Sequence, residues 1–564
     1  MDILFFYWRF QPILDIERES GRTVSHHSGR SRSRRCDVEV GSDDRRSTSS
    51  EPLRIGACGR TALHHADGGT MTASSNQDVG RRAVSGAAWV ALEKWASRLL
   101  SLVVFGILAR LLAPEDFGLM AICVSVSTIL QIFVQYGLAQ VLVQRRELDD
   151  REIHTAFWSG LAVSLLLYGL LCASIPLFLL IYDEPMLASI LPIAGLVLPL
   201  AGLASVPAAL LERDLRFRPL AVRQLSGVVV GSSVAVTVAV LGGGVWALVL
   251  QPVVTAGVAV VVLWIAGRWW PRLVFSRRAL RGMLGFSVLV VATELVGSIN
   301  FNIDKFVVGA YFDPTVLGYY FMAQRLLTLV LEVASAVLDK VSLSALSRVQ
   351  DDHQRFQRFF FALTFVSTTL GFALYGVLVG FGDPLTRLVF GPGWHDTVLI
   401  AALLAPMFML GTATYFDKNV MIARGRPAAT LGLAVVTLLL GLVILAVTLP
   451  WGILAVAAGR SFRQFAFWPV RLYVIRRTAN IDIRVYLAQF LAPTVAVLVL
   501  AGFGFAVTAS PWADAPLSVL TFVIPAVLLG VALYAGVIWL VARRRVREIQ
   551  SMLKRMYRRT PVPA

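Results

Sequence analysis

The sequence is poor in charged residues. Asp, Glu, Lys and Arg make up 15% of its 564 residues, whereas soluble globular proteins carry about 25%. Apolar residues make up 57% and fall into blocks of roughly 20 to 28 residues, a length that spans the hydrocarbon core of a bilayer as an α-helix. This combination excludes an ordinary soluble domain.

Cysteine is scarce as well. The four cysteines, Cys36, Cys58, Cys123 and Cys172, lack the spacing of metal ligands, and two of them lie inside apolar blocks. The sequence therefore predicts no disulfide framework, no metal site and no cofactor.

Short segments of alternating polarity, typical of membrane β-barrels, are missing too. The predicted fold is an all-α integral membrane protein with about 14 transmembrane helices. The predicted spans lie near residues 86–111, 117–142, 155–181, 186–211, 219–241, 245–267, 284–312, 315–342, 359–381, 397–422, 427–449, 452–474, 487–509 and 516–541.

Basic residues are almost absent from every second joint between these spans. The seven joints of one set contain a single basic residue, Arg387, whereas the six internal joints of the other set contain 19 arginines. Because cytoplasmic loops are enriched in Lys and Arg, both termini are predicted to be cytoplasmic. The net charge of +17 is then a topology signal, and no nucleic-acid partner is expected.

Long loops are also absent. The longest predicted external joint, residues 382–396, has room for little more than a turn. A membrane-embedded polymerase or glycosyltransferase needs larger loops to hold sugar and metal, so we expect that the protein is not an enzyme.

The first seventy residues differ from the rest. They are rich in Arg, Ser, His and Asp and lack helical periodicity, and they do not have the order of a signal peptide. Our hypothesis is that residues 1–80 are a disordered or miscalled extension, with Met71 as a candidate true start.

The sequence contains a weak internal repeat. LLAPEDFGLMAI around Pro114 corresponds to AYFDPTVLGYYFM around Pro314, with a glycine four residues after each proline. A parallel duplication of six helices is typical of alternating-access transporters. The predicted parts are a first bundle at 84–270, a second at 284–475, a C-terminal helix pair at 486–541 and a basic cytoplasmic tail at 542–564.

Several segments resemble one known family. FGILARLLAPEDFGLMAI, GLAQVLVQRRELDDREIHTAFW, LLERDLRFRPLA and FNIDKFVVGAYFDPTVLGYYFMAQRL resemble the polysaccharide-transporter branch of the MOP exporter superfamily. This branch includes Wzx-type flippases, among them the colanic acid exporters. The resemblance implies movement of an undecaprenyl-diphosphate-linked oligosaccharide across the bacterial inner membrane for exopolysaccharide, capsule or O-antigen (lipopolysaccharide) synthesis. A polymerase and a chain-length regulator of the same pathway would be its candidate protein partners.

Charged residues inside predicted spans are candidate functional residues. In the span 284–312, Glu294, Ser298, Asn302 and Lys305 share one helical stripe, and Asp304 points about 100° away from Lys305. Glu332 is aligned with Arg325 in the next span. A lipid diphosphate would need cationic hydrogen-bond donors along its path. The predicted cationic lining consists of Arg98, Lys305, Arg325, Arg460 and Arg463.

The carboxylates leave alternatives open. Glu294, Glu332 and Asp304 are predicted to pair with those cations or to bind a coupling proton or sodium ion. The polar stripe could line a water-filled cavity, or it could lock the bundle through pairs between helices. The alternative function is a MATE-like cation-coupled multidrug antiporter, although a cavity for cations should be net acidic. Arg471, nearer the cytoplasmic end of its span, is assigned to topology.

Overall fold

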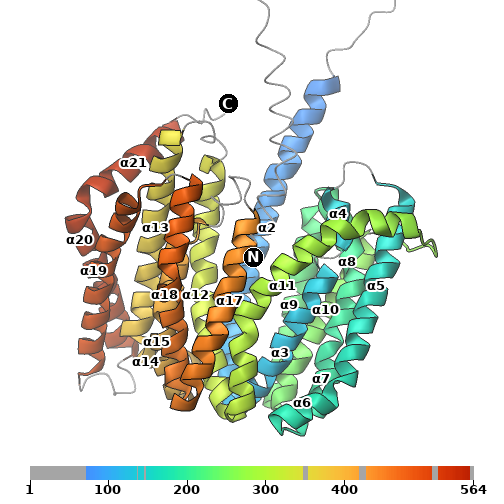
Figure 1. Ribbon diagram of the computed structural model, residues 1–564, viewed down its shortest axis with the longest axis horizontal. Coiled ribbons are helices and arrows are strands. Elements are labelled where there is room, and N and C mark those ends of the chain that lie inside the picture. Colours follow the sequence, from blue (N-terminus) through green and yellow to red (C-terminus); the bar gives the residue numbers. More distant parts are fainter. Residues whose placement is uncertain are drawn as a thin grey trace, which may run out of the picture. The chain divides into compact units, whose positions relative to one another are not determined.

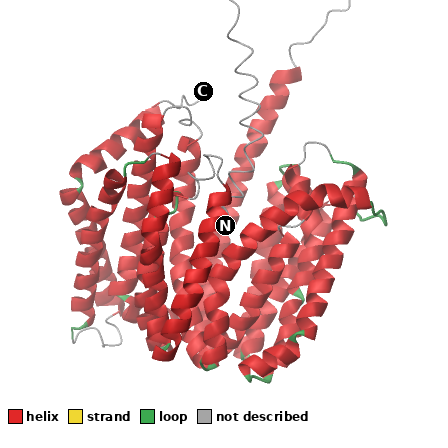
Figure 2. Cartoon of the chain, viewed as in Figure 1, coloured by secondary structure: helices red, strands yellow, loops and turns green. Residues whose placement is uncertain are grey.

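The computed structural model describes residues 71–135, 138–144, 148–267, 269–346, 353–417, 427–479, 481–510 and 519–558. All regular structure within these ranges is helical (Figure 2). Residues 85–564 form one compact unit, and the described part of the preceding unit, residues 71–84, is the beginning of helix α2. The hypothesis about residues 1–70 lies outside the described residues.

The first half of the chain contains nine described helices (Figure 1). They are α2 (Met71–Leu111), α3 (Pro114–Gln135), α4 (Leu138–Gln144), α5 (Asp150–Ala173), α6 (Ile175–Tyr182), α7 (Met186–Gly195), α8 (Val197–Arg213), α9 (Phe217–Val240) and α10 (Val245–Gly267).

The second half contains ten described α-helices and three single-turn segments. The helices are α11 (Arg277–Tyr311), α12 (Pro314–Leu346), α13 (His353–Gly380), α14 (Gly382–Phe390), α15 (His395–Ala413), α17 (Pro427–Thr448), α18 (Ile453–Ala479), α19 (Ile483–Thr508), α20 (Ile524–Val541) and α21 (Arg543–Arg558). The single turns are η1 (Pro392–Trp394), η2 (Leu449–Trp451) and η4 (Val519–Val523).

Each of the fourteen predicted spans overlaps a described helix, and the all-α membrane fold is confirmed. Within the described ranges, 10 helical segments are long and apolar enough to cross a membrane. The other four predicted spans lie in α2, α11, α12 and α18, the helices that carry the candidate charged residues. The number fourteen therefore stays a prediction.

Two predicted spans are interrupted by proline. The span 155–181 breaks at Ser174, because Pro176 has no N–H to bond the carbonyl four residues earlier. The span 186–211 breaks at Leu196, three residues before Pro199, for the same reason. Each of these predicted spans thus consists of two helices that are joined by a single residue.

The internal repeat is visible in the backbone. Helix α2 ends at Leu111 and α3 begins at Pro114, while α11 ends at Tyr311 and α12 begins at Pro314. Proline suits the first helical position because its missing N–H would have no partner there. The two helix breaks thus have the same form at positions 200 residues apart.

The helices pack as neighbours along each half of the chain. In the first half α9 and α10 pack against each other, and α8 packs on α5 and α10; in the second half α15 packs on α12, α13 and α18. The C-terminal pair α19 and α20 packs together and against α13. Helix α11 runs obliquely in Figure 1 and contacts α3 of one half and α17 of the other. The exact bundle boundaries remain a prediction.

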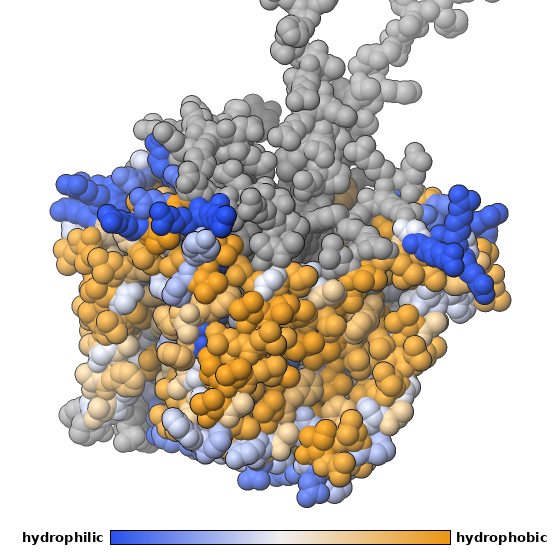
Figure 3. Space-filling model, viewed as in Figure 1, coloured by the Kyte–Doolittle hydropathy of each residue, from blue (hydrophilic) through white to orange (hydrophobic). Residues whose placement is uncertain are grey.

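The largest apolar core joins the two halves. It combines Leu108, Phe117 and Leu187 from the first half with Leu317 and Trp394 from the second. On the visible face in Figure 3, apolar side chains cover the middle of the helices, and hydrophilic ones gather near α21. The predicted basic tail is largely this helix, in which Arg543, Arg544 and Arg547 are exposed.

Candidate functional site

Asp304 on α11 and Arg460 on α18 form a buried ion pair. Their side chains are about 7% and 6% exposed, so neither charge is hydrated by bulk water. A buried charge whose partner is removed is strongly destabilising. The pair therefore fixes α18 against the C-terminal part of α11.

Helix α12 completes the network around Asp304. The Tyr320 hydroxyl donates to a carboxylate oxygen of Asp304, and the Gln324 side-chain amide donates to the same oxygen over 2.7 Å. Arg460 donates to the Tyr320 oxygen over 2.9 Å and to the Phe301 carbonyl over 3.2 Å. Three helices thus share one hydrogen-bonded centre.

Arg463 follows Arg460 on the same face of α18. It donates to the side-chain oxygen of Asn300 on α11 over 3.1 Å. A Cβ atom at Gly441 of α17 would lie 2.1 Å from a terminal nitrogen of Arg463. An alanine at this position would have to displace the guanidinium group from its contact with Asn300.

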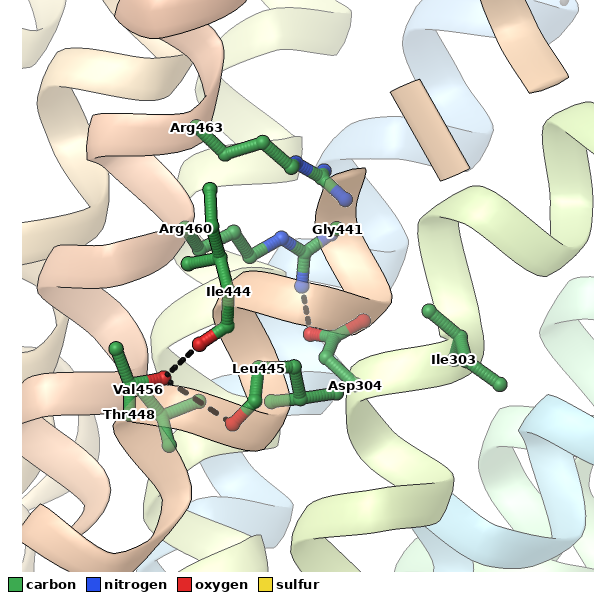
Figure 4. A pocket seen from close by; sticks show the side chains of 9 residues that line it. All are labelled: Ile303, Asp304, Gly441, Ile444, Leu445, Thr448, Val456, Arg460 and Arg463. Carbon is green, nitrogen blue, oxygen red and sulfur yellow. Dashed lines mark hydrogen bonds and ion pairs between the residues drawn. The ribbon is translucent and has the colours of Figure 1, made fainter. Parts of the chain in front are cut away.

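A small cavity adjoins these side chains (Figure 4). Its volume is about 20 Å³, and Asp304, Arg460 and Arg463 form its polar wall. Among the described residues, one carboxylate oxygen of Asp304 and the Nε atoms of both arginines find no hydrogen-bond partner. One water molecule would fit and could satisfy these atoms.

Lys305 points away from this network. Its ammonium group donates to the Asn302 side-chain oxygen over 2.9 Å, and Asn302 donates in turn to the Ser298 carbonyl over 2.9 Å. The aromatic rings of Phe301 and Phe321 lie 5.2 and 5.7 Å from the ammonium nitrogen. Within the described ranges Lys305 is buried without a carboxylate at ion-pair distance.

A second charged group connects α2 with α12. Glu332 lies 3.7 Å from Arg98 on α2 and 3.7 Å from Arg325 on its own helix. The three side chains are 18 to 35% exposed, and the Arg325 guanidinium lies 5.9 Å from the centre of the Phe105 ring. Two cations share one carboxylate here, which leaves a positive excess in a partly exposed place.

The structure thus divides the predicted site residues into separate groups. Asp304, Arg460 and Arg463 come together in one, and Arg98, Arg325 and Glu332 in another. Lys305 keeps its stripe with Asn302 and Ser298, and Asp304 is turned to other partners. Glu294 is half-buried and does not join the hydrogen bonds of this stripe.

Sequence reasoning missed some residues of the network. In the sequence, Tyr320 is one of several aromatic residues in an apolar segment. Its position one helical turn before Gln324 is the only sequence feature that indicates a polar role. The assignment of Arg471 to topology is incomplete, because Arg471 lies 3.2 Å from the fully buried carboxylate of Asp417. Tyr486 donates to the same carboxylate over 3.1 Å, so this arginine also joins helices.

Residues 107–399, just over half of the chain, match the family of polysaccharide biosynthesis proteins. The chain belongs to this family. This finding confirms the family resemblance of the four sequence segments.

Similar proteins include the succinoglycan biosynthesis transport protein ExoT of Rhizobium meliloti strain 1021. It is 29% identical over 318 residues, which are 56% of this chain and 64% of ExoT. The lipopolysaccharide biosynthesis protein WzxC of Escherichia coli K12 is 23% identical over 354 residues, or 61% of this chain and 70% of WzxC. The match therefore spans slightly less than two thirds of ExoT.

Solved structures show the same fold. The lipid II flippase MurJ in an inward closed conformation superposes with a TM-score of 0.65 at 15% identity, covering 81% of this chain and 99% of MurJ. An inward-facing MATE multidrug transporter of the MOP superfamily gives a TM-score of 0.52 at 14% identity, covering 72% and 98% of the two chains. At these identities the comparison concerns the fold alone.

Proposed function

We propose that this family member is a flippase for an undecaprenyl-diphosphate-linked oligosaccharide repeat unit. It would move this lipid across the plasma membrane for exopolysaccharide, capsule or O-antigen synthesis, by alternating access of two six-helix bundles. The observation that carries the proposal is the excess of buried and half-buried cations: Lys305 is buried, and Arg98 and Arg325 share one carboxylate.

A diphosphate suits these groups chemically. Guanidinium groups donate paired hydrogen bonds to phosphate oxygens, and an ammonium group offers a compact charge. Lys305 has an amide and two aromatic rings as neighbours, so an anion would compete for it with no carboxylate of the described part of the chain. We assign the direct contacts to Lys305, Arg98 and Arg325, while Arg460 and Arg463 hold the wall behind them.

The carboxylates have different proposed roles. Asp304 and Glu332 balance neighbouring arginines. Glu294 stands apart from these pairs and is our candidate for a coupling proton or sodium ion. A cation-exporting MATE-like antiporter remains the alternative function, and the five basic against three acidic candidates favour the anionic lipid.

The proposed location and orientation in the membrane rest on the distribution of arginines. The protein would sit in the bacterial inner membrane with both termini in the cytoplasm, because 19 arginines lie in the joints of one side. It would transport without chemical conversion of its substrate, and the polymerase and chain-length regulator of the pathway would be its candidate partners.

Polysaccharide export in cells tests this function. Lys305→Ala should abolish export by a strain that depends on this protein, while the protein remains in the membrane. Arg387→Ala is the matched control, because Arg387 pairs with Asp383 at an exposed position away from the site. Normal export by the Lys305 variant would contradict the assignment, and loss of membrane protein would support a purely structural role.

A further inference from the structure

The two repeats meet backbone to backbone at a reciprocal contact. A Cβ atom at Gly118 of α3 would lie 1.9 Å from the carbonyl oxygen of Pro314, and one at Gly318 of α12 would lie 1.9 Å from the carbonyl oxygen of Pro114. Real Cβ atoms do not approach other atoms below 3.0 Å. Because the opposing atoms belong to the backbone, no side-chain rotation could make room.

Fully buried side chains seal this crossing. Phe117 and Leu317, which precede the two glycines, have no exposed surface. The Phe117 ring packs edge-on against Trp394, with 5.2 Å between ring centres, and Tyr319 packs against the same indole at 6.0 Å. The crossing thus joins both halves in a dry contact.

Polar contacts beside the crossing connect the same halves. The Trp394 indole donates to the Ala109 carbonyl on α2 over 2.9 Å. Arg110, in the last turn of α2, donates to the Val389 carbonyl over 3.1 Å and also to the Leu388 carbonyl. Both carbonyls are at the C-terminal end of α14, where a cation is favoured by the helix dipole.

Partly exposed charged side chains lie along the same interface, further from Pro114 and Pro314. Arg98, Arg325 and Glu332 connect α2 and α12 there with 18 to 35% of their side chains exposed. The halves are therefore in dry contact at the Pro114 and Pro314 end, which the distribution of arginines assigns to the outside, and the interface becomes charged and partly exposed further along the two helices.

We infer that Gly118 and Gly318 are the positions that close the external end of the transport path. Their missing side chains let α3 and α12 meet in the outside-closed state, and this contact must separate whenever the path opens outward. Alanine at either position would penalise the closed state and leave the separated state unaffected. The inference rests on the alternating access in the proposed function.

A labelling experiment in cells tests the inference. The four native cysteines are first replaced, and one reporter cysteine is then introduced. Leu317→Cys reports on Gly118→Ala, and Phe117→Cys reports on Gly318→Ala; each reporter is compared with and without the glycine substitution. Each reporter is fully buried and lies on the helix opposite the altered glycine. A membrane-impermeant maleimide added from outside should label each reporter at least about tenfold faster when the opposite glycine is alanine.

Two control variants distinguish a specific loss of closure from a general disturbance of helix packing. Gly504→Ala places a Cβ atom 2.6 Å from the Gly380 backbone within the second half, and Gly257→Ala meets nothing within 4 Å. Neither should change labelling. The inference would be overturned if Gly504→Ala increased the labelling rate equally. It would also be overturned if Gly118→Ala and Gly318→Ala proteins accumulated in the membrane and their labelling rates did not increase.

A different variant tests the closure if the glycine variants are not found in the membrane. Trp394→Ala removes the indole seal and its hydrogen bond to Ala109, and it should also increase labelling of both reporters. Unchanged labelling in this variant would contradict the closure. Labelling does not require a substrate, so it tests the closure independently of transport. If the predicted labelling is seen in a protein that does not move the lipid, the proposed function is wrong and the inferred closure is still supported.

Discussion

Asp304 and Lys305 are neighbours in the sequence and have separate partners in the structure. Asp304 pairs with Arg460, whereas Lys305 hydrogen-bonds to Asn302. One residue step turns a helical side chain by about 100°, so the two charges have different surroundings: Asp304 meets Arg460 of α18, whereas Lys305 lies near the Phe321 ring of α12. The adjacent residues thus serve two purposes: Asp304 belongs to a fixed ion pair, and Lys305 is a buried cation that meets no carboxylate within the described ranges.

The ion pair predicts a strong coupling between two substitutions. Asp304→Asn should leave Arg460 buried without a counter-charge and lower stability by about 3 to 5 kcal/mol. Arg460→Gln should have a similar cost, and the double variant should recover most of the loss. Thermal stability of the purified variants, followed by size-exclusion chromatography after heating, measures this. Additive losses in the double variant would contradict the pair.

Gly441 predicts a steric relationship between α17 and α18. Gly441→Ala would push a methyl group into the Arg463 guanidinium, and overpacking of this kind costs about 1 to 3 kcal/mol. Adding Arg463→Ala should remove most of that penalty. Gly432→Ala on the same helix, where no atom of the described residues lies within 4 Å, is the control. A penalty that persists in the double variant would show that another neighbour causes it.

Glu332 predicts a change in substrate affinity. Glu332→Gln would release Arg98 and Arg325 from a partly exposed carboxylate, and such pairs contribute up to about 1 kcal/mol. Binding of undecaprenyl diphosphate to the purified protein should therefore tighten by a few-fold. Glu548→Gln on α21, at an exposed position, should have no effect. Weaker binding by the Glu332 variant would argue against an anionic ligand at this site.

The topology predicts opposite labelling of two surface positions. A cysteine replacing the exposed Ser551 on α21 should react only from the cytoplasm, and one replacing the exposed Asp396 on α15 only from outside. Impermeant maleimide applied to intact cells and to inverted vesicles distinguishes the two. Labelling of both positions from one side would show that the predicted topology is wrong.

The sequence predicts the helical fold well because each helix satisfies its own backbone within one apolar segment. The proline breaks at Ser174 and Leu196 fall inside such segments, where hydropathy alone has little resolution. The internal repeat is also readable, since Pro114 and Pro314 mark the same helix break.

The pairing of the site residues is less accessible to sequence reasoning. Helical geometry separates Asp304 from Lys305, but the choice of Arg460 as partner depends on how α18 packs on α11. Tyr320 has no signature that distinguishes it from the neighbouring aromatic residues until α12 is placed against Asp304. The reciprocal contact of Gly118 and Gly318 likewise exists only between helices.

Flipping by the purified protein in liposomes tests the central claim most directly. The substrate is an undecaprenyl-diphosphate-linked oligosaccharide with a fluorescent sugar, and an impermeant quencher reports its arrival at the outer leaflet. We predict transport by the unaltered protein, loss of transport with Lys305→Ala, and unaltered transport with Arg387→Ala. Equal transport by all three proteins, or by none while a cationic drug is exported against an ion gradient, would contradict the account.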